Sequence, residues 1–196
     1  MIKAYIGNEI DEELFEKMLA LDHIIFPPEG GDALPAEYFR ELYADSKDGL
    51  FILAEEETDE VVGYLNCIVL DSIQRDHYLA GGHYGDLKNK GMTVGDNILY
   101  IYTIAIASAY RGSGVMKQIG AVFVDWIETC KSNGRLLSEV LAEAVSADGA
   151  RTLAKGFAMI PLHHVDEIGR GHYYSPDQLQ SYCEKIKKKL DGSNFF

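Results

Sequence analysis

The spacing of apolar side chains divides the chain into short strands and amphipathic helices. Apolar residues recur at helical spacing over 12–26, which predicts a helix with one buried face. A proline at an early position favours a second, shorter helix over 35–43. Runs rich in β-branched and aromatic residues predict strands over 2–6, 50–54, 61–70 and 98–107.

The second half of the chain continues this alternation. Apolar spacing over 115–131 predicts a core-facing helix whose buried stripe includes Ile119, Phe123 and Ile127. The segment 71–97 is polar and lacks a clear period, so we expect a long connecting loop there. The remaining expected elements are a strand over 135–142, a helix over 147–155, a strand pair over 158–165 and 170–174, and an added C-terminal helix over 176–190.

This order of elements predicts a single domain over residues 1–196. Its fold class is α+β (mixed α/β), with a single central sheet that is flanked by helices. A chain of 196 residues is long enough to bury a complete core.

Net charge, apolar stretches and cysteine spacing indicate which partners and which cellular compartment to expect. The formal charge of −13 argues against a nucleic acid, because binding to phosphates requires a basic face. It is compatible with attraction of a cationic substrate, although solubility alone also explains it. We find no secretory signal and no apolar stretch near the ~20 residues that a membrane span needs, so no membrane partner is expected. The three cysteines form no CxxC pair, which predicts reduced thiols in the cytoplasm.

The segment 97–117 carries the strongest chemical signal. A strand runs into a turn that contains Gly112 and Gly114, and this turn leads directly into the helix 115–131. Glycine admits backbone dihedrals that are closed to other residues, and the amides of a helix N-terminus bind anions such as a pyrophosphate. The segment has neither a P-loop lysine nor a GxGxxG pattern, which disfavours a nucleotide-phosphate enzyme.

The pattern Arg111-x-x-Gly114-x-Met116 resembles the CoA loop of the GCN5-related N-acetyltransferases (GNAT family). The following helix and strand, and the Gly156-Phe157 pair after the next helix, extend the resemblance over roughly residues 98–158. It implies a mostly antiparallel sheet, acetyl-CoA as co-substrate and no metal. It also implies that the glycine turn holds the pyrophosphate and that residues 104–106 hold the pantetheine arm and the thioester carbonyl. The matching CoA-binding positions are Ile104, Ala105, Ile106, Arg111, Gly112, Ser113, Gly114, Val115 and Met116.

The expected catalytic groups depart from the family pattern. Family members often carry a glutamate on the fourth strand, but this chain has Tyr100 and Tyr102 at the matching positions. The tyrosine common on the helix before Gly-Phe is absent from 150–155. We therefore predict that Tyr102 or Tyr100 donates a proton, or relays one through water to Glu143 or Glu139 on the next strand.

The amine acceptor is expected to enter opposite CoA, beside the break after the first helix and the segment 71–97. Acidic and aromatic groups there suit a cationic amine through charge pairing and cation–π contacts. The acceptor-site candidates are Glu29, Asp32, His77, Tyr78, His83, Tyr84 and Asp86, with His163 and His164 as further candidate bases.

Two functions remain open from the sequence. The first is an N-acetyltransferase that moves an acetyl group from acetyl-CoA to a primary amine of a small molecule or protein, by direct attack in a ternary complex. The second is a CoA-binding sensor or interaction module of the same fold with weak or no activity. A homodimer is also left open.

Overall fold

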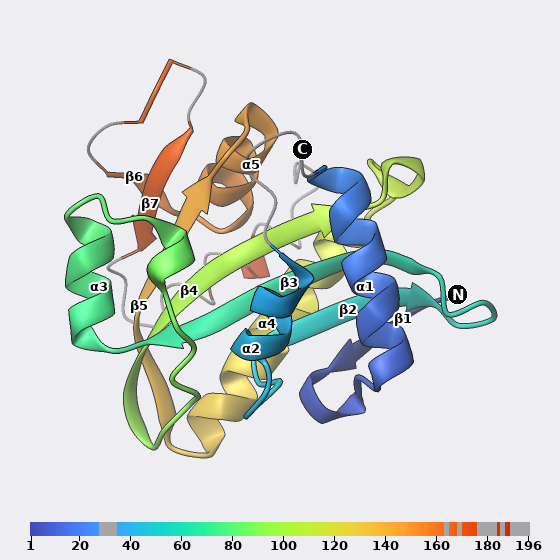
Figure 1. The fold of residues 1–196 in the computed structure, drawn as a ribbon, viewed down its shortest axis with the longest axis horizontal. Helices are drawn as coiled ribbons and strands as arrows, with labels where there is room; N and C mark the ends of the chain where they lie inside the picture. Colours follow the sequence, from blue (N-terminus) through green and yellow to red (C-terminus); the bar gives the residue numbers. More distant parts are fainter. Residues whose placement is uncertain (28–34, 163–164, 168–169, 176–183, 185–186, 189–196) are drawn as a thin grey trace.

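A single seven-stranded sheet organises the chain, and the strand order is β1-β2-β3-β4-β5-β7-β6. The computed structural model describes residues 1–27, 35–162, 165–167, 170–175, 184 and 187–188. Each neighbouring pair is antiparallel except β4 and β5, which run parallel (Figure 1). The prediction of one central, mostly antiparallel sheet is confirmed. The strands are β1 (Ile2–Ile6), β2 (Leu50–Glu55), β3 (Val61–Leu70), β4 (Gly95–Ile106), β5 (Arg135–Ala144), β6 (Ile160–Pro161) and β7 (Gly171–Ser175).

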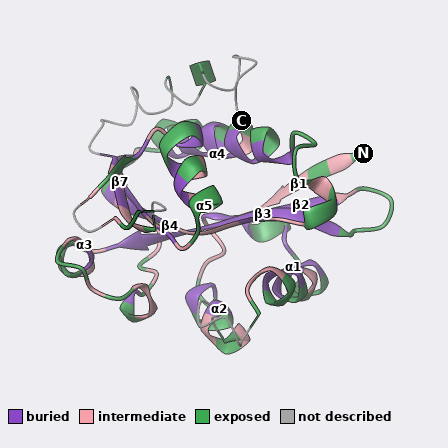
Figure 2. Cartoon of the chain, turned by 90° about the horizontal axis from the view of Figure 1, so that it is seen from above, coloured by how far each residue is buried: buried purple, intermediate pink, exposed green. Residues whose placement is uncertain are grey.

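Helices cover both faces of this sheet. Helices α4 (Val115–Ser132) and α5 (Ala147–Arg151) lie on one face, and α1 (Glu12–Ile25) and α2 (Ala36–Leu42) lie on the other (Figure 2). Each face buries its own apolar cluster, as expected for helices that pack an apolar stripe on a sheet. We call these the α4 face and the α1 face.

Two predicted elements differ from the structure. The segment 71–97 contains helix α3 (Ser72–Leu79), which Asp71 caps by accepting a hydrogen bond from the amide of Gln74 at 2.8 Å. Only Tyr78 of this helix is buried, so it carries too short an apolar stripe to show a period. The strand expected over 158–165 is reduced to Ile160–Pro161.

Some predictions fall on residues that the structure does not describe. The C-terminal helix 176–190, together with Cys183, lies almost wholly outside the described residues, as do His163, His164, Glu29 and Asp32. Cys67 and Cys130 are buried and free. Every helix within the described part of the chain is too short or too polar to span a bilayer.

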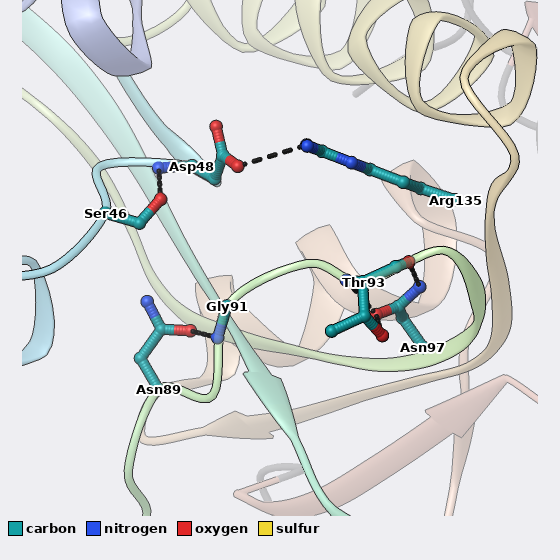
Figure 3. Close-up of polar contacts among 7 residues, drawn as sticks. All are labelled: Ser46, Asp48, Asn89, Gly91, Thr93, Asn97 and Arg135. Carbon is teal, nitrogen blue, oxygen red and sulfur yellow. Dashed lines mark hydrogen bonds and ion pairs between the residues drawn. The ribbon is translucent and has the colours of Figure 1, made fainter.

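A polar network fixes the point where β4 and β5 begin to pair (Figure 3). The buried amide of Asn97 donates to the carbonyls of Thr93 and Gly95, each at 2.8 Å, and to that of Leu136 on β5 at 3.1 Å. Its oxygen accepts from the Thr93 amide at 2.9 Å. Because one buried side chain satisfies backbone groups on both strands, this end of the ladder is held closed.

Candidate active site

Strands β4 and β5 separate halfway along the sheet. Their ladder spans seven residue pairs, from Gly95 with Arg135 to Ile101 with Ala142, and then stops. Beyond Ile101, strand β4 pairs only with β3, so its edge toward β5 has no partner strand from 102 to 106. A gap bordered by unpaired backbone groups can bind an extended, hydrogen-bonding molecule.

A β-bulge lies at the point of separation. In the pairing with β3, Thr103 faces Asn66 and Ile101 faces Cys67, which leaves Tyr102 as the additional residue. The bulge changes which residues face each side. Tyr100 and Tyr102 belong to the α1 face, as does Ala105 after the bulge, whereas Ile104 packs toward the α4 face. The bulge therefore brings groups of both faces together at the opening of the gap.

The glycine turn leads into the N-terminus of α4 beside this gap. Gly112 and Gly114 have φ of +77° and +92°, a region that favours glycine, and a Cβ at either position would meet no atom within 4 Å. Asp11, Asp71 and Ser146 cap α1, α3 and α5 through side-chain oxygens. Gly114 leaves α4 without a side-chain cap and without an acidic residue in its first turn. The terminus is thus built to accept an anion from outside the chain.

The first turn of α4 has backbone amides without helical partners. The first helical hydrogen bond runs from the amide of Gln118 to the carbonyl of Gly114, so the three amides from 115 to 117 form no helical bond. Met116, the position where the family prefers a smaller residue, is 7% exposed and packs into the α4-face cluster. Its side chain is directed into the core, and its amide remains at the helix terminus.

Two contacts hold the turn in place. The hydroxyl of Tyr110 donates to a carboxylate oxygen of Glu55 on β2 at 2.6 Å, which raises the pKa of Tyr110 to about 12. The hydroxyl of Ser113 donates to the carbonyl of Tyr110 at 2.5 Å. Arg111 is exposed and forms no ion pair with the described residues, so its charge is available at the rim.

A cavity of about 600 Å³ joins the glycine turn to the α1 face. Of the predicted CoA-binding residues, the structure places all but Ser113 and Val115 in its wall; Val115 lies in the core at 1% exposure. The three predicted catalytic residues Tyr100, Tyr102 and Glu143 also line it. The structure therefore brings the two halves of the predicted site into one cavity.

Tyr102 and Tyr100 lie together but differ in surroundings. The buried hydroxyl of Tyr102 lies beside that of Tyr38 but makes no hydrogen bond of normal geometry with a described residue. Burial, and then the nearby Tyr38 hydroxyl, raise the pKa of Tyr102 well above its ordinary value of 10. Tyr100 is 1% exposed and packs edge-to-face against Tyr78 at 5.2 Å between ring centroids. Burial likewise raises its pKa, so both phenols stay protonated at neutral pH.

The two candidate glutamates on β5 have different roles in the structure. Arg75 of α3 binds both carboxylate oxygens of Glu139, through Nε at 2.8 Å and a terminal nitrogen at 2.9 Å. This bidentate pair attaches α3 to β5 and occupies Glu139. Glu143 instead lines the cavity, and His172 on β7 lies 3.8 Å from one of its oxygens. Burial lowers the pKa of His172, which favours its neutral form.

Some of the acceptor-site candidates from 77 to 86 lie at the cavity, and the others do not. Tyr84 lines the cavity, and His83 stacks on it with ring centroids 4.3 Å apart. Tyr78 is fully buried, and its hydroxyl donates to the Ala142 carbonyl, so its prediction as an acceptor contact is wrong. His77 and Asp86 lie 3.5 Å from each other and are not part of the cavity wall.

Sequence reasoning missed several residues of the cavity wall. Ser146, Asp148, Arg151 and Thr152 surround the short α5 and the π-helical turn Thr152–Gly156 that follows it. Phe26, Phe39 and Asp22 on the α1 face were also missed. Asp22 on α1 is 3% exposed and accepts a hydrogen bond from the hydroxyl of Tyr64. A single acidic residue on the inner side of an amphipathic helix was the available signal for Asp22.

The pKa of Asp22 makes stability depend on pH. Burial raises it above the ordinary 3.8, and the smaller effects of Tyr64 and His23 oppose this. The stability contribution of the protonated form is present below pH 3.8 and is lost as the pH rises through the folded-state pKa. Asp22→Asn cannot ionise and keeps the acceptor oxygen for Tyr64. We expect its unfolding free energy to rise relative to the wild type as the pH increases from 3.8 through the folded-state pKa of Asp22, measured by urea unfolding. An unchanged difference across this range would contradict the assignment.

A sheet opened between parallel strands, beside an uncapped helix, defines the acyl-CoA N-acyltransferase fold. Two Arabidopsis thaliana structures share it. NAA60 in complex with acetyl-CoA matches with a TM-score of 0.58 and 14% identity, over 89% of this chain and 97% of that chain. Naa50 in complex with the bisubstrate analogue CoA-Ac-MVNAL matches with a TM-score of 0.52 and 14% identity, over 88% of this chain and 95% of that chain. A chain of the NatC complex bound to Gag peptide and CoA matches with TM-score 0.59, 15% identity and 90% and 99% coverage.

The sequence profile of the Acetyltransferase (GNAT) family matches residues 15–152, and the chain belongs to this family. No curated protein sequence matches the chain. The family resemblance inferred from the CoA loop is confirmed.

Proposed function

We propose that this protein transfers the acetyl group of acetyl-CoA to a primary amine by direct attack in a ternary complex. The observation that carries the proposal is the gap between β4 and β5. It connects an uncapped helix terminus, suited to a pyrophosphate, with a cavity lined by aromatic and acidic residues on the opposite face. Membership of the acetyltransferase family supports the same reaction class.

The chain offers fitting groups for the pyrophosphate, the pantetheine arm and the thioester of CoA. The amides of Gly112, Gly114 and 115–116 would bind the pyrophosphate, and Arg111 would add a positive charge. The unpaired edge of β4 at 104–106 would bind the pantetheine arm and place a backbone amide on the thioester oxygen. Such a donor stabilises the oxyanion that forms in the tetrahedral intermediate.

The reaction requires proton movements that the cavity residues can provide. The acceptor ammonium first loses a proton to Glu143, directly or through water. The neutral amine then attacks the carbonyl carbon, and the carbon–sulfur bond breaks as the intermediate collapses. Tyr102 donates its hydroxyl proton toward the departing sulfur and receives the proton that leaves the amine nitrogen. Its raised pKa keeps the hydroxyl protonated for this role.

The acceptor class is a primary amine of a small molecule or of a protein. Two of the fold neighbours were solved with a peptide or with a bisubstrate analogue bearing MVNAL, which supports a peptide amine as one acceptor to test.

A second candidate function is a CoA-binding module without turnover. Tyrosine at 100 and 102, where the family often has glutamate, favours this alternative.

The proposal is tested by measuring acetyl-CoA binding and CoA thiol release with a panel of aliphatic amines and peptides. We expect binding and amine-dependent release, and a fall of about 10²-fold in kcat for Glu143→Gln. Glu139→Gln is the matched control on the same strand: it breaks the pair with Arg75 and should leave kcat near the wild-type value. Binding without release for every amine would support the alternative function.

A further inference from the structure

Asp22 is a buried carboxylate that the proposed mechanism does not use. It lies in the last turn of α1, lines the cavity and is 3% exposed. Its position over the gap follows from the ladder: Tyr64 of β3 pairs with Ala105 of β4, and the Tyr64 hydroxyl donates to Asp22 Oδ1. The carboxylate is therefore held on the α1 face above the part of β4 that has separated from β5.

The described residues give Asp22 no cationic partner. No lysine, arginine or histidine nitrogen among them lies within 4.0 Å of its carboxylate, and the neighbouring His23 acts on it only through space. A buried carboxylate that has one hydrogen bond and no counter-ion lowers stability, and buried charges are normally paired. A cation bound in the cavity would supply the missing partner.

The surrounding wall also suits a cation. Four aromatic residues line the same cavity: Phe26 directly after α1, Phe39 of α2, Tyr84 and Tyr102. Aromatic ring faces attract an ammonium group, most strongly where water is excluded. Phe39 is 1% exposed, so this wall is dry next to the sheet. An aromatic enclosure with one buried carboxylate is therefore chemically selective for an ammonium over a neutral group.

We infer that Asp22, held by Tyr64, binds the ammonium group of the acceptor and makes the protein selective for cationic amines. The inference rests on the proposed function and specifies its substrate class. Asp22 acts before the chemical step, because it holds the protonated amine until Glu143 removes the proton. A carboxylate that only anchored Tyr64 would be replaceable by asparagine without effect on ligands.

The test measures binding and needs no turnover. Protein saturated with CoA is titrated with n-butylamine or n-butanol at neutral pH, and affinity is followed by NMR chemical shifts. These probes share an apolar chain and differ in charge. We expect the wild type to bind the amine at least about 10-fold more tightly than the alcohol, and Asp22→Asn to lose this preference. Asparagine keeps the acceptor for Tyr64, so the fold is retained; circular dichroism and CoA affinity verify this.

Asp148→Asn is the matched control. Asp148 is another acid of the cavity wall, but it is paired with Arg151 at 2.8 Å and its side chain is 78% exposed. The variant should keep the preference for butylamine. Equal affinities for the two probes in the wild type, or an unchanged preference in Asp22→Asn, would overturn the inference. Thiol-release assays on the same proteins separate failure of this inference from failure of the proposed function. Selective amine binding without thiol release would support the inference and contradict the proposed acetyl transfer.

Discussion

Gly114→Asp is expected to weaken CoA binding strongly while the fold persists. The new carboxylate would lie beside the free amides of α4 and repel the pyrophosphate from this position. We expect the Kd for CoA to rise by about 100-fold or more, which corresponds to about 3 kcal/mol. Isothermal titration calorimetry with CoA measures the effect directly.

Gly114→Asn is the matched control for this prediction. Asparagine and aspartate have the same shape, and both tolerate positive φ better than other side chains, although φ is +92° here. No atom within 4 Å obstructs a Cβ at this position. The difference between the two variants therefore isolates the added charge. Equal losses of affinity would show that backbone strain, and not the anion site, explains the effect.

Tyr102→Phe is expected to lower kcat by about 10²-fold while CoA affinity stays unchanged. The phenylalanine keeps the ring contacts with Phe39 at 6.2 Å and Tyr100 at 5.6 Å, so packing is preserved. Only the hydroxyl, which makes no hydrogen bond of normal geometry with a described residue, is removed. Steady-state kinetics and CoA titration on the same preparation give both quantities.

Tyr100→Phe is the comparison for Tyr102→Phe. The two tyrosines lie two residues apart on the same face of β4, and both line the cavity. If Tyr102 supplies the proton, Tyr100→Phe should change kcat by less than about 3-fold, within the ordinary range for a peripheral hydroxyl. The reverse pattern would assign the proton to Tyr100. Wild-type rates in both variants would remove tyrosine from the mechanism.

Much of the fold could be predicted from periodicity. Helices α1 and α4 and strands β2, β3 and β4 have long, regular patterns, and their observed bounds lie close to the predicted ones. Helix α3 was missed because Tyr78 is its only buried residue, so the helix shows no apolar period; Arg75 binds Glu139, and Asp71 caps the helix. The Arg75–Glu139 pair joins residues 64 positions apart and leaves no local pattern, whereas the Asp71 cap was a local signal that the prediction did not use.

The candidate site, like the fold, could be predicted only in part from the sequence. The CoA loop is contiguous in sequence, and its glycines adopt the positive φ that their type predicts. The cavity wall combines α1, β4 and the segment after β5, which are separated by tens of residues. Asp22 and Thr152 belong to this wall only because the sheet places them there. The bulge at Tyr102, which decides the face of each β4 residue, comes from the pairing with β3 and has no mark in the sequence.

The closed end of the β4–β5 ladder holds the two strands together next to the open end. Asn97 joins the two strands where pairing begins, and Arg135 at the start of β5 contacts Asp48 at 3.3 Å. Strand β4 also stays paired with β3 from Ile98 to Ile106. The open end of the β4–β5 gap is therefore bordered by a strand that is fixed both by its other neighbour and by the junction at Asn97, so the gap is preformed by the sheet and needs no ligand to separate the strands.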